Sequence, residues 1–333
     1  MPTTMPIRMP ACTARRWLLP TLALLGALVT TDLARAESPA SRSAAAQEAV
    51  VRAGDRAAER VRAEASRVKF GHADLYVPTF FQPVAGTYDL VVHFHGIPSL
   101  QEDNFERAHV NAVVVSVNLG LASDAYSGAF RAPGSFDLLL QQTQRALDQT
   151  GRAPGATLGR IALSAWSAGF ASVGAILKQP GVADRVDAVL LEDGPHTMYD
   201  SPHHIYEPGM EKWVRFAEAA MRGEKLFALT HSSIQTLGYP STTETIGELL
   251  RETSVEKTPT DAVGPRGMHA IYESHRGSFH VEGYEGQTAK DHIDHIKGMA
   301  ETLLPYLRAR WQSPAAGESP GNEAGPARLV SRP

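Results

Sequence analysis

Six short, almost continuously apolar runs alternate with longer amphipathic segments along the middle of this chain. The runs are rich in β-branched residues and lie far enough apart for a crossover helix between neighbours. Apolar runs without polar alternation are typical of strands that are covered on both faces, as in a parallel sheet. The predicted strands cover residues 89–94, 112–117, 160–165, 186–191, 225–230 and 278–284. The sequence therefore predicts an α/β fold with a mainly parallel central sheet flanked by helices.

Apolar residues at helical intervals fill most of the segments between the predicted strands. The predicted helices cover residues 135–149, 168–179, 208–221 and 288–311. Two irregular stretches interrupt this rhythm, one after residue 191 and the other over residues 232–276. Long insertions in an α/β domain usually form lids or binding loops, so we expect both to form walls of a site.

The N-terminus has the pattern of a secretory signal peptide. Arginines precede an apolar run over residues 17–29, and Ala34-Arg35-Ala36 is a small-x-small site that signal peptidase recognises. The run is shorter than the roughly 20 residues of a membrane-spanning helix. We therefore expect removal of residues 1–36, no stable membrane anchor afterwards, and a secreted or periplasmic protein. Arg15-Arg16 only weakly resembles a twin-arginine signal, so the export route stays open.

Composition excludes several classes of site. Cys12 is the only cysteine and leaves with the predicted signal peptide, so a thiol nucleophile and a cysteine-built metal site are excluded. A formal net charge of −4 without a dense basic block argues against a nucleic-acid partner. Residues 37–69 are expected to form a helical leader, residues 70–312 the folded domain, and residues 313–333 a flexible tail.

A strand pattern, a serine among small residues and a helix pattern follow one another around Ser167. A serine on a sharp strand-to-helix turn needs neighbours without bulk two positions before and after it, and Ala165 and Gly169 stand there. The positive end of the following helix would favour a developing negative charge. Ser167 is therefore the candidate nucleophile, although a serine that only caps a helix has the same pattern.

This segment resembles the nucleophile elbow of the α/β-hydrolase superfamily, in the A-x-S-x-G form of some secreted bacterial lipases. The resemblance implies an α/β-hydrolase fold, a serine–acid–histidine triad and no cofactor. In the family's strand count, 186–191 and 225–230 are the sixth and seventh strands, so the two irregular stretches are lid-like insertions after these strands, and they match nothing specific in the family. An apolar strand that ends in His95-Gly96 is similar to the oxyanion segment of the family. By that resemblance, the backbone N–H groups of Ile97 and Ala168 would hold the oxyanion.

His93 and His95 also permit a metal-site reading. The His-x-His-x-Asp-His pattern of metallo-hydrolases is incomplete here, because Gly96, Ile97 and Pro98 follow. We therefore expect no metal, and a structural role for at least one of the two histidines.

In α/β-hydrolases the acid and the histidine follow the serine along the chain. His292 lies near the start of a helix, at the edge of its apolar stripe, and is the candidate base, with His295 and His280 as alternatives. Asp193 follows the predicted strand 186–191 and is the candidate acid, with Glu192 as the alternative, because the next predicted strand, 225–230, is followed by no carboxylate. A turn residue before Gly194-Pro195 is the other interpretation of Asp193.

These features predict a secreted serine hydrolase that cleaves carboxylic esters through an acyl-enzyme on Ser167. The expected partner is a small-molecule or lipid-like ester. Two alternatives stay open: an amidase or peptidase with the same triad, and an exported binding protein without catalytic activity on a hydrolase fold.

Overall fold

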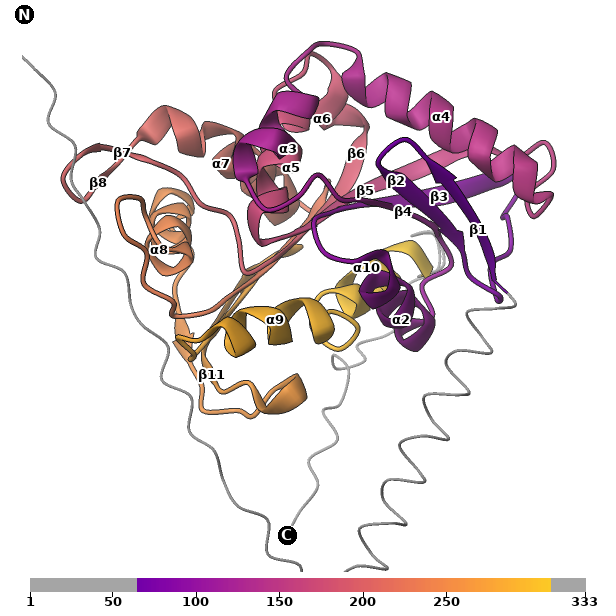
Figure 1. The fold of residues 1–333 in the computed structure, drawn as a ribbon. Coiled ribbons are helices and arrows are strands. Elements are labelled where there is room, and N and C mark those ends of the chain that lie inside the picture. The colour runs from indigo at the N-terminus through magenta and orange to yellow at the C-terminus, as the bar shows by residue number, and fades with distance from the viewer. Residues whose placement is uncertain (1–64, 313–333) are drawn as a thin grey trace, which may run out of the picture. The chain divides into compact units, whose positions relative to one another are not determined.

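The computed structural model describes residues 65–312, and its central element is a ten-stranded mixed sheet (Figure 1). The strand order is β1-β2-β4-β3-β5-β6-β9-β12-β11-β10. The strands are β1 (Ser66–Phe70), β2 (Ala73–Val77), β3 (Thr87–Phe94), β4 (Val113–Val117), β5 (Thr157–Trp166), β6 (Val186–Glu192), β9 (Leu226–His231), β10 (Thr258–Pro259), β11 (Ala270–Arg276) and β12 (Phe279–Tyr284). Strands β4, β3, β5, β6, β9 and β12 pair in parallel, and antiparallel pairs flank them on both sides. The predicted fold class is confirmed, and all six predicted strands lie in this parallel core.

Helices cover both faces of the sheet (Figure 1). One face carries α3 (Ser123–Ala129), α4 (Ser135–Thr150), α5 (Phe170–Leu177), α6 (Val182–Arg185) and α7 (Glu207–Met221), and the other carries α2 (Pro98–Ala108), α9 (Ala289–Lys297) and α10 (Leu304–Gln312). Because side chains alternate along a strand, each parallel strand sends residues into both cores. Val91 packs with α10 and Val92 with the opposite layer, and both are fully buried. None of the helices within residues 65–312 is long and apolar enough to cross a membrane.

The single helix predicted over residues 288–311 is wrong, because the structure has two helices there, α9 and α10. Gly298 ends α9 at its C-cap. Pro305 lies in the first turn of α10, where its missing N–H and its ring are tolerated, whereas both would disrupt a continuous helix.

The stretch 232–276 is more regular than predicted. It contains α8 (Thr242–Thr253) and β11 (Ala270–Arg276). Helix α8 begins with a capping box in which Ser241 and Glu244 satisfy each other's backbone N–H groups, a signal that the sequence does carry. The expectation of a loop without secondary structure is therefore wrong for these residues.

Strand β1 occupies the end of the segment 37–69 that we predicted to be a helical leader. Its residues alternate between half-buried and exposed, which is the period of a strand with one covered face. Val68 and Phe70 pack against the core, and β1 pairs antiparallel with β2. The folded domain thus begins before residue 70. The predicted signal peptide (1–36), the rest of the leader and the tail (313–333) lie outside the described residues.

The two insertions follow β6 and β9, as predicted, and they contact each other. The first contains a small antiparallel pair, β7 (Tyr199–Ser201) and β8 (His204–Ile205). Tyr199 Oη donates a hydrogen bond to Glu244 Oε1 of α8 at 2.7 Å. Both insertions leave the carboxyl ends of parallel strands, which is where an open α/β sheet places its binding crevice.

Gly169 marks the closest approach between the turn after β5 and the end of β3. A Cβ atom at this position would lie 2.1 Å from the backbone oxygen of Phe94. Backbone cannot move aside as a flexible side chain can, so only glycine allows this approach. The predicted need for a small residue here has this physical cause.

Substitution of Gly169 by Ala should therefore lower the free energy of unfolding by at least about 3 kcal/mol, through overpacking against fixed backbone. Gly174→Ala is the matched control, because its Cβ would lie 2.7 Å from the flexible end of Lys212 and in ordinary contact with Trp213 at 3.4 Å, with no backbone atom among these contacts. In a helix interior this control should be neutral or stabilising by up to about 1 kcal/mol. Urea unfolding of both variants checks the prediction, and equal losses would contradict it.

Candidate active site

Ser167 occupies a strained turn between β5 and α5. It is the first residue of a 3₁₀ turn, η1 (Ser167–Gly169), and its φ angle is 48°. Residues other than glycine rarely adopt this left-handed region, and the strain costs of order 1–3 kcal/mol. Ser167 is half-buried and lines two neighbouring cavities. This is the sharp strand-to-helix turn that the sequence predicted.

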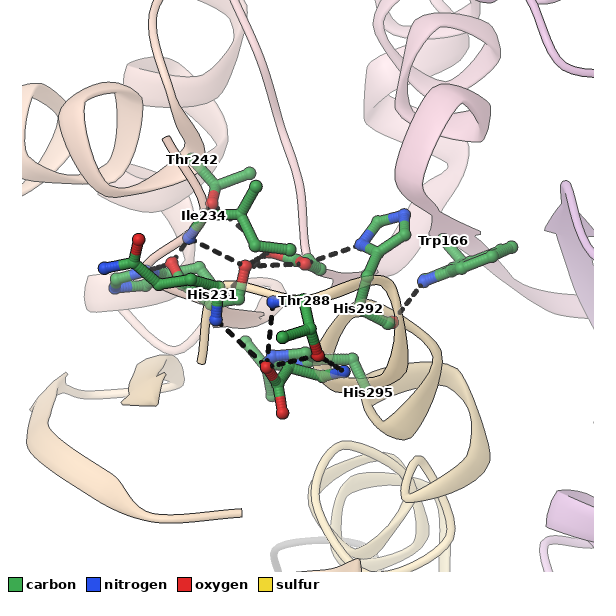
Figure 2. Close-up of polar contacts among 12 residues, drawn as sticks. Trp166, His231, Ile234, Thr242, Thr288, His292 and His295 are labelled. Carbon is green, nitrogen blue, oxygen red and sulfur yellow. Dashed lines mark hydrogen bonds and ion pairs between the residues drawn. The ribbon is translucent and has the colours of Figure 1, made fainter. Parts of the chain in front are cut away.

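Asp193 and His292 contact each other although they are far apart in the chain (Figure 2). His292 Nδ1 donates to Asp193 Oδ2 at 2.6 Å. Because a carboxylate only accepts, this bond fixes the proton of a neutral imidazole on Nδ1 and leaves Nε2 as an acceptor. His292, Asp193 and Ser167 all line one cavity of about 260 Å³.

Asp193 is ionised in spite of its burial. Its exposed fraction is only 2%. Burial by itself raises the pKa of Asp193, but the hydrogen bond from His292, the neighbouring His295 and the backbone N–H of Ser232 outweigh burial and hold the pKa well below its usual range. The hydroxyl of Ser232 adds a bond of 2.8 Å to Oδ2, and Thr242 Oγ1 one of 3.2 Å to Oδ1.

Trp166 holds His292 from the other side. Its Nε1 donates to the backbone oxygen of His292 at 2.9 Å, as Figure 2 shows, and the two rings lie with their centroids 4.6 Å apart. The indole also stacks on the ring of His95, with centroids 4.9 Å apart. Trp166, the residue before Ser167, thus contacts both the candidate base His292 and His95, which directly follows β3.

The predicted oxyanion donors lie at two helix beginnings. Ile97 is the N-cap residue of α2, and Ala168 is the second residue of η1. Amide groups at the first positions of a helix have no acceptor within the helix, so they are available to an anion. Ala168 lines the larger cavity together with Ser167.

His93 and His95 both have structural hydrogen bonds. His93 Nε2 donates to the backbone oxygen of His95 at 2.7 Å, and its Nδ1 lies 2.9 Å from Ser164 Oγ. Burial lowers the pKa of His93 to about 3, so the ring is neutral at ordinary pH. His95 Nδ1 bonds Tyr126 Oη at 2.9 Å. These contacts fix the left-handed turn at His95 and Gly96, with φ angles of 75° and 99°.

The alternative bases lie elsewhere. His295 is buried beneath the site, with Nδ1 2.8 Å from Thr230 Oγ1, and Figure 2 shows its ring apart from that of His292. His280 lies within β12, as predicted, and stacks on Tyr306 with centroids 4.1 Å apart. Of the three candidate histidines, only His292 contacts Asp193.

Glu192, the alternative acid, has a different environment from Asp193. It is fully buried, and both of its carboxylate oxygens lack a hydrogen-bond partner among the described residues. Burial raises its pKa well above the usual range, so the group is protonated. A neutral carboxylic acid cannot hold the His292 proton as Asp193 does.

Sequence reasoning missed His196. This residue follows Pro195 in the first insertion and lines both cavities beside Ser167. The first cavity also has walls from the second insertion, including Ile234, Thr236 and Tyr239. Both insertions therefore contribute to the site, as predicted. A histidine directly after Asp193-Gly194-Pro195 was the available signal.

Comparison with known proteins gives structural neighbours only. No protein-family model and no curated protein matches the chain. Among solved structures, the feruloyl esterase module of Clostridium thermocellum is 11% identical with a TM-score of 0.43, covering 73% of this chain and 86% of its own. A siderophore hydrolase of Aspergillus nidulans is 13% identical with a TM-score of 0.42, and the match covers 75% of this chain and 97% of the hydrolase. A puromycin-hydrolysing peptidase of Mycobacterium tuberculosis is 16% identical with a TM-score of 0.37, and the match covers 73% of this chain and 38% of the peptidase.

The chain's own topology carries the fold assignment. A mostly parallel sheet flanked by helices, with a strained serine between a central strand and a helix, gives this chain the α/β-hydrolase fold that the sequence predicted.

The buried Glu192 makes a prediction about stability and pH. Its folded-state pKa is raised, so the folded protein keeps a proton that the unfolded chain releases above about pH 4.3. Wild-type stability should fall as pH rises above that value, by up to about 1.4 kcal/mol per pH unit from this group. Glu192→Gln cannot titrate, so its stability relative to wild type should increase from pH 5 to pH 8.

Denaturant unfolding across this pH range provides the measurement, and the exposed Glu285→Gln is the control. If the difference in unfolding free energy between wild type and Glu192→Gln stays constant over this pH range, Glu192 is ionised in the folded protein and the prediction is wrong.

Proposed function

We propose that this chain is a serine hydrolase that cleaves carboxylic esters, with Ser167 as nucleophile, His292 as base and Asp193 as the orienting acid. The observation that carries this proposal is the Asp193–His292 hydrogen bond of 2.6 Å beside a cavity that Ser167 shares. It combines an ionised acid, a histidine with a defined tautomer and a serine on a strained turn.

In the proposed first step, His292 Nε2 accepts the proton of Ser167 Oγ while that oxygen attacks the ester carbonyl. The tetrahedral oxyanion receives hydrogen bonds from the backbone N–H groups of Ile97 and Ala168. The imidazolium of His292 then donates its proton to the leaving alcohol, and an acyl-enzyme forms on Ser167. Asp193 stabilises the positive charge on His292 during both transfers.

Water completes the cycle. It enters beside His292, which removes one of its protons as the water oxygen attacks the acyl carbon. The imidazolium then returns this proton to Ser167 Oγ as the acyl–oxygen bond breaks, so the carboxylic acid leaves and both residues regain their starting states. Each of these steps uses only groups of the chain and water, so the proposed mechanism assigns no role to a cofactor or metal.

Ester rather than peptide cleavage is proposed because of the size of the site. The two cavities next to Ser167 measure about 260 and 500 Å³, and the larger one lies in the range of small-molecule sites. Peptidase activity with the same triad is the second candidate. Export from the cytoplasm is part of the proposal and rests on the N-terminal sequence pattern alone.

Replacement of Ser167 by Ala should lower kcat for p-nitrophenyl ester hydrolysis by at least about 10³-fold, because no acyl-enzyme can form. Labelling by a fluorophosphonate probe should disappear with it. Ser127→Ala is the control, since this half-buried serine lies outside both cavities. If folded wild-type protein is not labelled by the probe, the serine hydrolase proposal is wrong. Faster turnover of a peptide panel than of the esters would favour peptidase activity, the second candidate.

Replacement of Asp193 by Asn should lower kcat by about 10²–10⁴-fold at neutral pH with a smaller change in KM. The amide keeps the shape but loses the charge that stabilises the His292 imidazolium, and it allows the wrong tautomer. Steady-state kinetics of this variant and of Glu192→Gln separate the two acids. A larger loss in Glu192→Gln than in Asp193→Asn would assign the role to Glu192.

A further inference from the structure

The two cavities that meet at Ser167 differ in their walls. The small cavity, about 260 Å³, contains the groups around His292 and Asp193. The large cavity, about 500 Å³, has both apolar and polar walls. The apolar walls come from Leu121, Ala168 and Phe170, and the polar ones from Ser123, Asp124 and Thr197. His196 and Tyr239 line both cavities with Ser167. A substrate whose carbonyl lies at Ser167 would therefore pass beside His196 whichever cavity its larger part occupies.

The ring of His196 is fixed in position and in tautomer. Its Nδ1 lies 3.0 Å from the backbone oxygen of Pro240. A carbonyl oxygen can only accept, so Nδ1 carries the proton and Nε2 has a lone pair. Phe170 and Tyr239 pack edge-to-face on the same ring, with centroids 5.7 and 5.2 Å away. These three contacts hold the imidazole between α5 and the second insertion.

Nε2 of His196 is the unused end of this ring. This atom makes no hydrogen bond with any residue of the described part of the chain. It is also not completely buried. The atom therefore has access to the cleft. Burial lowers the pKa of His196, which keeps the ring neutral and Nε2 an acceptor at neutral pH.

Neither Asp193 nor His292 can satisfy this acceptor. Asp193 is itself an acceptor, and its oxygens are occupied by Ser232, Thr242 and His292. The Nδ1 proton of His292 is directed at Asp193. No donor among the described residues bonds His196 Nε2. Water in the free enzyme, or a donor group of a bound substrate, would supply its partner.

We propose that His196 is a specificity-determining residue that accepts a hydrogen bond at Nε2 from a hydroxyl group of the substrate near the scissile carbonyl. The preferred substrates are thus esters with a hydroxyl group close to the ester bond, on the acyl or the alcohol side. This inference rests on the proposed esterase function and adds the substrate class to it. When an ester without the hydroxyl binds, it displaces the water from His196 Nε2 and leaves this acceptor without a donor. The free-energy cost of the unpaired acceptor makes the contact selective for hydroxyl esters.

Two sets of matched substrates test the proposal and distinguish the two sides of the ester. On the acyl side, phenyl 3-hydroxybutanoate is compared with its 3-methoxy analogue and with phenyl butanoate. On the alcohol side, 2-hydroxyethyl butanoate is compared with 2-methoxyethyl and ethyl butanoate. In at least one set, kcat/KM for the hydroxyl ester should exceed that for both analogues by about tenfold, which corresponds to one hydrogen bond of typical strength.

Two variants of His196 locate the preference on this side chain. Asn in place of His196 keeps a donor near the Nδ1 position for Pro240 but has no atom at Nε2, so the hydroxyl preference should fall to less than about twofold. Gln in place of His196 brings an oxygen near the Nε2 position and should recover part of the preference. The readout in each variant is the ratio of kcat/KM between the hydroxyl ester and its unsubstituted analogue, so a general loss of turnover that affects both esters equally does not alter it.

The results separate the two proposals. Active wild-type enzyme without a hydroxyl preference in either set, or with a preference that persists in His196→Asn, would overturn the role of His196 and leave the esterase assignment intact. If His196→Asn does not fold, the wild-type substrate sets and His196→Gln decide. Absence of turnover with all six esters, together with absence of fluorophosphonate labelling, would overturn both proposals.

Discussion

The buried, ionised carboxylate of Asp193 is the constraint on which the rest of the site depends. At an exposed fraction of 2%, this group stays charged only because donors surround it. Ser232 comes from the end of β9, Thr242 from the start of α8 and His292 from the start of α9. The charge therefore requires the strand order, the second insertion and helix α9 to be in place together. In the proposed function, this charge is the electrostatic basis for a base at His292.

The second insertion contributes to both halves of the proposed function. Its residues Ser232 and Thr242 bond Asp193, and the backbone oxygen of Pro240 fixes the tautomer of His196. A displacement of this segment would thus change both the charge that supports His292 and the acceptor that faces the substrate. Chemistry and selectivity are coupled here through contacts of one loop rather than through the sheet.

Much of the fold and the candidate triad could be predicted because local rules determine them. Continuous apolar runs marked the parallel strands, small residues marked the turn at Ser167, and chain order placed the acid and histidine after it. The sequence favoured Asp193 over Glu192 from its place at the strand end, but it did not show the different environments of these adjacent residues, which the structure gives. His196 and the hydroxyl donors to Asp193 were missed because their roles arise from contacts between distant segments. His196 and Pro240, for example, are 44 positions apart in the chain. The break at Gly298 and Pro305 was visible in the sequence but was outweighed by the apolar period around it.

Direct observation of the acyl-enzyme tests the central claim most directly. Wild-type protein is mixed with an excess of p-nitrophenyl acetate, quenched in acid within milliseconds to seconds, digested and mapped by mass spectrometry. The account predicts one acetyl group per chain, on the peptide that contains Ser167, at an occupancy that decays as the substrate is exhausted. An acetyl group on another residue, or rapid release of p-nitrophenol with no acyl-protein at any time point, would contradict it.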